Sequence, residues 1–203
     1  MNDANLEKTL EYIIEHPGLH ARWLNTLSYL EHVGSRKILK TQSSDTTDEN
    51  TLRHAAEEAR HAYQFKKMIE KLGSNIQDYS SEKMLCGFSA NRYFQSLDSI
   101  VKKKIYKDKK SSRICYLYVT ALVEERAGSL YPLYQKVLKK MNSPVDLSNI
   151  IKEEERHLEE MYNGINEIDT GLMQEFRREE NKLFNRYLEN LIKYLRINNT
   201  VAV

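Results

Sequence analysis

The chain has 203 residues, of which 40% are hydrophobic and 30% are charged, and this length suits one domain with a sizeable core. Its net charge of +2 is small, so bulk electrostatics single out neither nucleic acid nor a membrane as a partner. The 7 glycines and 3 prolines are far fewer than usual, and this scarcity of helix breakers favours long helices.

Targeting and redox signals are weak. Cys86 and Cys115 form no Cys-x-x-Cys motif, so we expect no disulfide framework and a reducing, cytoplasmic compartment. Residues 1–18 are acidic and interrupted, and they lack the apolar stretch of a signal peptide. The longest largely apolar run, 115–123, is too short to span a bilayer. We therefore expect no membrane partner.

The first predicted hairpin contains two helices. A helix over 19–40 places Leu27, Glu31 and Gly34 on one face, because steps of three and four residues share a helix face. After a polar loop, a helix over 48–72 is expected to end at the glycine that follows it. This hairpin thus carries one glutamate inside an apolar stripe of its first helix.

A long connection follows the hairpin. It is predicted to contain a helix over 81–106, which ends in the lysine-rich run 102–110. We expect this run to be a solvated surface, although contact with an anionic partner such as RNA stays open.

The second predicted hairpin joins a helix over 111–141 to one over 147–168 by a short turn. Pro132 lies inside the first of these helices and predicts a kink. A final helix is expected over 172–197.

A weak internal repeat links the two hairpins. The sequence Glu-Glu-Ala-Arg-His at 57–61 recurs 96 residues later as Glu-Glu-Glu-Arg-His at 153–157. Independently, residues 31–35 recur 94 residues later at 125–129, with Glu, Gly and Ser matched. Two matches at nearly one offset indicate a duplicated helical hairpin.

Each half of this repeat supplies one glutamate on its first helix and one Glu-x-x-His on its second. Side chains three residues apart lie on one helix face with Cβ atoms about 5–6 Å apart, so a carboxylate and an imidazole can close on one cation. Four carboxylates and two imidazoles suit a pair of iron or manganese ions. The expected metal ligands are Glu31, Glu58, His61, Glu125, Glu154 and His157.

These motifs resemble those of the ferritin-like di-iron carboxylate superfamily, nearest to its rubrerythrin-like, oxidase and oxygenase branches. The resemblance covers the four motif-bearing helices. It implies an all-α fold: a ferritin-like four-helix bundle over 1–203 with one long crossover and an extra C-terminal helix. It also implies two metal ions, iron with manganese as the alternative, and it gives Glu58 and Glu154 the bridging positions.

Several alternatives stay open at this point. Glu124 rivals Glu125 because it also falls on a fair apolar stripe, and the repeat alignment favours Glu125. Tyr118 is either a core residue or a donor to a metal ligand, and Arg60 and Arg156 are expected to contact ligands or line the rim. Glu57, Glu153 and Glu155 are expected to be solvated. His54 lies one turn before Glu58, so it could reach the site, but a surface or packed histidine is the favoured interpretation.

The expected function is a di-iron oxidoreductase that activates dioxygen or peroxide. An external electron donor is expected, because the chain has no paired Cys-x-x-Cys motifs for a rubredoxin module. One alternative is a non-catalytic metal-binding or helical interaction protein, in which the helix over 172–197 forms a homodimer face. The others are enzymes like the tRNA hydroxylases or the aldehyde-deformylating oxygenases of this superfamily. A salt-bridge network without metal is the structural alternative.

Overall fold

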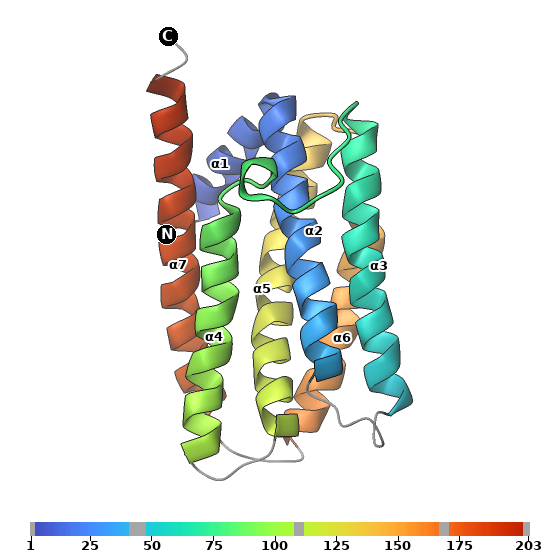
Figure 1. Ribbon diagram of the computed structural model, residues 1–203, viewed down its shortest axis with the longest axis vertical. Coiled ribbons are helices and arrows are strands. Elements are labelled where there is room, and N and C mark those ends of the chain that lie inside the picture. The colour runs from blue at the N-terminus through green and yellow to red at the C-terminus, as the bar shows by residue number, and fades with distance from the viewer. Residues whose placement is uncertain (1–2, 41–47, 108–111, 167–170, 201–203) are drawn as a thin grey trace.

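The computed structural model describes residues 3–40, 48–107, 112–166 and 171–200, and in these ranges the chain is all-helical, with no strand. The helices form a bundle in which most run along the long axis of the molecule (Figure 1). The all-α prediction is therefore confirmed over the described residues. The α-helices are α1 (Asp3–Glu15), α2 (Pro17–Lys40), α3 (Glu49–Lys71), α4 (Gly87–Lys107), α5 (Ser112–Lys140), α6 (Ser148–Asn166) and α7 (Met173–Thr200).

The two expected hairpins are the most extensive helix pairs in the molecule. Helix α2 packs along α3, and α5 packs along α6, while α3 also contacts α6. Helices α4 and α7 lie side by side along one edge of the bundle (Figure 1). The two halves of the sequence repeat therefore face each other in the interior.

Local sequence signals set several helix ends. The Asp48 side chain caps α3 by accepting a hydrogen bond from the Thr51 backbone N–H at 2.9 Å. Gly73 ends the same helix with a φ of 73°, a left-handed conformation that glycine adopts without steric cost. Pro132 does not end α5, which continues to Lys140, and the kink expected there stays a prediction.

Helix α1 was not expected from the sequence. Leu6, Leu10 and Ile13 are buried, and their spacing of four and three residues puts them on one face. This face packs against α2 and α5. The sequence contains this apolar stripe, but the acidic residues between its members made the segment look like a loop.

The connection before α4 also differs from the prediction. A helix was expected from residue 81, but α4 begins at Gly87, and only Ser81–Lys83 form a short 3-10 turn before it. Leu85 is fully buried, and its backbone N–H donates to the Thr26 hydroxyl of α2 at 2.8 Å. Backbone groups of this segment bond to α2 instead of to one another, so the helix starts later.

The lysine-rich run 102–110 is only partly described, because residues 108–111 lie outside the described ranges. Lys103 is exposed on α4, whereas Lys104 pairs with Glu175 of α7 at 3.1 Å. Both cysteines of the chain are free thiols, as expected.

Two apolar clusters fill the core, and the glutamate-bearing turns lie between them. On α2, Leu27 belongs to one cluster and Ile38 to the other, with Glu31 between them. On α3, Phe65 belongs to the same cluster as Leu27, and Ala55 belongs to the same cluster as Ile38. The polar centre is therefore enclosed by apolar packing at both ends.

Candidate metal centre

Each helix of the two hairpins contributes one buried glutamate to a shared cluster in the interior. These glutamates are Glu31 on α2, Glu58 on α3, Glu124 on α5 and Glu154 on α6, with exposed fractions from 3% to 8%. Burying a carboxylate is costly unless a positive charge or hydrogen bonds compensate for it. This cluster therefore requires compensation from within the core.

Three histidines lie among these glutamates. His54 and His61 on α3 and His157 on α6 are each at most 1% exposed. The ligand atoms form two overlapping groups, in each of which all atoms lie within 4.8 Å of one another, and these buried groups can hold a metal ion. The first group is His54, Glu58, Glu124 and His157, and the second is Glu31, Glu58, His61 and Glu154. Glu58 is common to both groups.

The Glu-x-x-His pairs act across the interface between α3 and α6. The Nδ1 atom of His61 lies 3.0 Å from Glu154 Oε1 and 3.8 Å from Glu58 Oε1. The Nδ1 atom of His157 lies 3.3 Å from Glu58 Oε1 and 3.6 Å from Glu154 Oε2. Both imidazoles therefore direct the same ring nitrogen at carboxylates of both halves.

The other ring nitrogen of each of these histidines is held by a carboxylate of the opposite half. Nε2 of His61 lies 2.7 Å from Glu153 Oε2, and Nε2 of His157 lies 2.8 Å from Glu57 Oε2. A carboxylate partner accepts the Nε2 proton, so the neutral form of each imidazole would present its Nδ1 lone pair to the centre. This is the arrangement that orients histidines toward metal ions in proteins.

Two arginines complete this outer layer. Arg60 donates to Glu153 at 2.7 Å, and Arg156 lies 2.7 Å from Glu57. Both arginines thus contact the carboxylates that orient the histidines. The sequence analysis expected them to contact ligands or to line the rim of the site.

The centre contains buried polar atoms that lack hydrogen-bond partners among the described residues. Most buried polar atoms in folded proteins are hydrogen-bonded, so a concentration of exceptions at one point needs an explanation. A cation coordinated by carboxylate oxygens and imidazole nitrogens would satisfy all of them at once. The atoms are Glu58 Oε1, Glu154 Oε1, His61 Nδ1 and His157 Nδ1.

The electrostatics of the centre are strongly coupled. Burial and neighbouring carboxylate charges raise the pKa of Glu31 and of Glu124 well above the usual range. Burial would also raise the pKa of Glu58 and of Glu154. The neighbouring imidazoles of His157 and His54 nevertheless hold the pKa of Glu58 well below its usual range, and the Glu124 carboxyl together with His157 and His61 lowers that of Glu154 to about 2. Burial opposes the charged form of His157, yet its carboxylate partners raise its pKa to about 10. Protons can therefore offset part of the charge that divalent cations would balance.

The structure corrects the choice between two adjacent glutamates. Glu125, which the repeat alignment favoured, points away from the centre and accepts hydrogen bonds from Arg177 of α7 at 2.6 and 2.9 Å. Tyr162 of α6 donates to the same carboxylate. Adjacent helical residues point about 100° apart, so only one of the two can face the centre, and that residue is Glu124.

Two further residues of the centre were expected elsewhere. His54 was expected on the surface or in ordinary packing, but its Nε2 lies 3.2 Å from Glu124 Oε1, and its Nδ1 lies 3.0 Å from the Tyr116 hydroxyl. Glu57 was expected to be solvated, but it is buried against His157. The signal for His54 was its position four residues before Glu58, on the same helix face.

Two tyrosines of α5 have different surroundings. Tyr131 donates a hydrogen bond to Glu31 and so contacts the centre directly. Tyr118, which the sequence offered as a donor to a ligand or as a core residue, packs edge-on against Phe176 of α7 with ring centroids 5.0 Å apart. Its ring belongs to one of the apolar clusters.

Comparisons with known proteins give no relative from which to transfer a function. No protein-family model matches the chain, and neither does any curated protein or solved structure. Among the described residues, no helix combines the length and apolar character needed to cross a bilayer. The functional argument therefore rests on the buried centre itself.

Proposed function

We propose that this chain is a two-metal carboxylate oxidoreductase of the ferritin-like kind, with iron as the metal and manganese as the alternative. In this proposal α2, α3, α5 and α6 form the ferritin-like four-helix bundle, joined by one long crossover that contains α4, and α7 is the additional helix. The residues that would hold the ions are Glu31, His54, Glu58, His61, Glu124, Glu154 and His157.

One observation carries the proposal: carboxylate oxygens and imidazole nitrogens of Glu58, Glu154, His61 and His157 that lack hydrogen-bond partners within the described part of the chain converge in the buried interior. Four ionised glutamates carry a formal charge of −4, which two divalent cations balance. A salt-bridge network explains the centre less well, because Arg60 and Arg156 pair with the outer glutamates rather than with the four inner ones.

The donor set suits iron or manganese better than soft metal ions. Carboxylate and imidazole donors suit both ions, whereas sites for soft ions use thiolates, and neither cysteine belongs to the two donor groups. Glu58 is the residue placed to bridge, because it alone belongs to both groups. Glu154, which the resemblance also made a bridging residue, belongs to one group.

Bound iron would supply reversible electron transfer to dioxygen or peroxide, with an external donor providing the reducing equivalents. The chain supports such chemistry in three ways. Glu57 and Glu153 hold His157 and His61 in the orientation that ligation requires. Tyr131 holds a proton at the Glu31 carboxylate. The apolar clusters on both sides lower the local polarity around the centre, which strengthens electrostatic interactions inside.

Mixing the anaerobic ferrous protein with air-saturated buffer tests the proposal. We expect the protein to bind about two iron ions per chain and to consume dioxygen faster than free ferrous iron at the same concentration, as measured with an oxygen electrode. Metal binding without accelerated oxygen or peroxide consumption would instead support a passive metal-binding protein. Failure to bind any metal would remove the proposal.

A further inference from the structure

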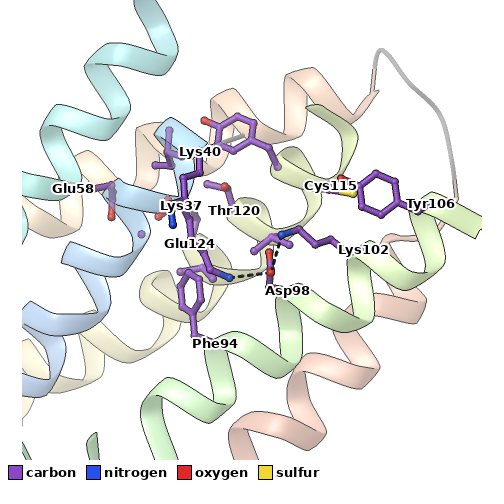
Figure 2. Close-up of a pocket in the computed structure, with 15 residues that line it drawn as sticks. Lys37, Lys40, Glu58, Phe94, Asp98, Lys102, Tyr106, Cys115, Thr120 and Glu124 are labelled. Atoms are coloured by element: carbon purple, nitrogen blue, oxygen red, sulfur yellow. Dashed lines mark ion pairs between the residues drawn. The ribbon is translucent and has the colours of Figure 1, made fainter. Parts of the chain in front are cut away.

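A pocket leads from a lysine-rich part of the surface to the candidate metal centre. It has a volume of about 110 Å³ and lies between α2, α4 and α5. Glu58 and Glu124 form part of its wall. Three lysines line the part that we call its mouth: Lys40 and Lys102, and Lys37, whose Nζ atom is buried (Figure 2). The pocket therefore connects solvent with two of the residues proposed to hold metal.

The mouth of the pocket carries excess positive charge. Among the residues that the structure describes, Asp98 is the only acidic residue that lines the pocket apart from the two glutamates of the centre. Lys37 and Lys102 both pair with Asp98 at 3.0 Å, which Figure 2 shows as dashed lines. Lys40 adds a third ammonium group, so the described side chains of the mouth carry a formal charge of +2. A single carboxylate shared by two lysines leaves donor capacity for an incoming anion.

Much of the pocket wall is apolar. Its apolar lining residues include Ile38, Phe94, Val119 and Val123, and Thr120 adds one hydroxyl group. Such a wall favours a hydrocarbon body and offers little to a sugar or a nucleotide, because buried polar groups of those ligands would lose their hydrogen bonds to water.

A second cavity of about 70 Å³ continues the same path. It shares Gly34, Phe94 and Val123 with the first pocket, and all four inner glutamates contribute to its wall. The rest of its lining is largely aromatic or aliphatic, including Trp23 and Leu130. Gly34 lies at the junction, and a Cβ atom there would come within 3.4 Å of Glu58 Oε2. Glycine thus keeps the passage beside the centre open.

We propose that this passage binds a small monocarboxylic acid with an apolar body, its carboxylate at the lysines and its body directed toward the metal centre. A cavity of about 150 Å³ holds benzene, so the two cavities suit a body of roughly four to eight carbons. As a substrate assignment this rests on the proposed oxidoreductase function, but binding of the acid does not require turnover.

Calorimetric titration with hexanoate tests the proposal on the full-length protein, both metal-free and after anaerobic ferrous loading. Hexanoate should bind at one saturable site and at least tenfold more tightly than hexan-1-ol, hexylamine or acetate, which lack the anionic head or the body. Because the lysines need no metal, this result is independent of oxygen consumption. Failure of the oxygen test therefore leaves the binding test intact, and the reverse also holds.

Lysine variants test where the carboxylate of hexanoate binds. The double substitution Lys40→Gln with Lys102→Gln should weaken hexanoate about five- to tenfold and leave hexan-1-ol unchanged. Lys103→Gln is the matched control, since Lys103 is an exposed neighbour on α4 that does not line the pocket. Equal binding of acid and alcohol, or an unchanged hexanoate affinity in the double variant, would overturn the proposal.

A second pair of variants locates the body. Gly34→Leu fills the junction and should reduce hexanoate binding at least fivefold, whereas Gly128→Leu should not, because Gly128 is exposed and a Cβ there meets nothing within 4 Å. The two glycines occupy equivalent positions in the sequence repeat, so they form a matched pair. Equal effects of the two substitutions would place the ligand elsewhere and contradict the inference.

Discussion

The two halves of the candidate centre are alike in their outer layer and different in their inner one. Each half gives a carboxylate to the histidine of the other, at 2.7 Å for Glu153 with His61 and 2.8 Å for Glu57 with His157. Each also gives an arginine that pairs with one of those carboxylates. This exchange between α3 and α6 follows the 96-residue repeat residue by residue.

The inner layer departs from the repeat at two positions. His54 of the first half has Ile150 as its counterpart 96 residues later, and Ile150 lies in the apolar core. The counterpart of Glu31 by alignment is Glu125, yet the structure uses Glu124. One donor group therefore contains two histidines and the other contains one.

This difference coincides with a contact from outside the repeat. Glu125 pairs with Arg177 of α7, and α7 follows the second hairpin without being part of the repeat. A contact from outside the repeat thus decides which of two adjacent glutamates faces the centre. We expect the two ions to have unequal environments as a consequence of His54.

The largest effect is expected from Glu58→Ala. Because Glu58 alone belongs to both donor groups, its loss should reduce the metal content from about two ions per chain to nearly none. Elemental analysis after ferrous loading and desalting measures this directly. Circular dichroism of the variant checks that the helices are retained. A folded variant that still binds two ions would show that Glu58 is not shared by the two metal sites.

His54→Ile should have a smaller effect, since it gives the first half the residue that the second half has at Ile150. We expect one ion to be lost or weakened by more than about tenfold while the other stays, because His54 belongs to only one group. Competitive titration with a chelator resolves the two affinities. Identical binding in the variant and the parent would mean that His54 is a packed histidine and that the halves are equivalent.

Glu57→Gln and Glu153→Gln test the outer layer. Loss of a carboxylate that orients a ligating histidine typically costs about 10- to 100-fold in metal affinity, and each variant should weaken one ion more than the other. Glu57 should matter more, because its side chain is 11% exposed against 25% for Glu153, so its hydrogen bond is less screened by water. The same chelator titration ranks the two, and the opposite order would contradict the burial argument.

The smallest effect is expected from Glu125→Gln. Its pair with Arg177 is partly exposed, and exposed ion pairs contribute about 0.2–1 kcal/mol. The metal content should stay unchanged while the free energy of unfolding in urea falls by about 1 kcal/mol or less. Loss of a metal ion from this variant would restore the alignment-based assignment in place of Glu124.

Much of the fold was predictable from the sequence, because long segments with regular apolar spacing and few breakers indicate helices. The ends at Asp48 and Gly73 followed from capping chemistry. The late start of α4 was not predictable, because the burial of Leu85 against α2 is a contact between distant segments.

The centre was predictable only as far as its duplicated motif extends. Both Glu-x-x-His pairs and Glu31 lie where the pattern placed them. The choice of Glu124 over Glu125 as the glutamate that faces the centre depends on the contact of Glu125 with Arg177. No local sequence pattern connects Arg177 with α5. Glu57 was misjudged because a glutamate is normally exposed, and its partner His157 lies 100 residues away in the chain.

The most direct test of the account is anomalous diffraction from crystals of the iron-loaded protein. We predict two anomalous peaks about 3.5–4 Å apart, one on each side of the Glu58 carboxylate, with His54 and His157 beside one peak and His61 beside the other. A structure in which the inner glutamates and histidines pair only with one another, with no peak between α3 and α6, would contradict the account.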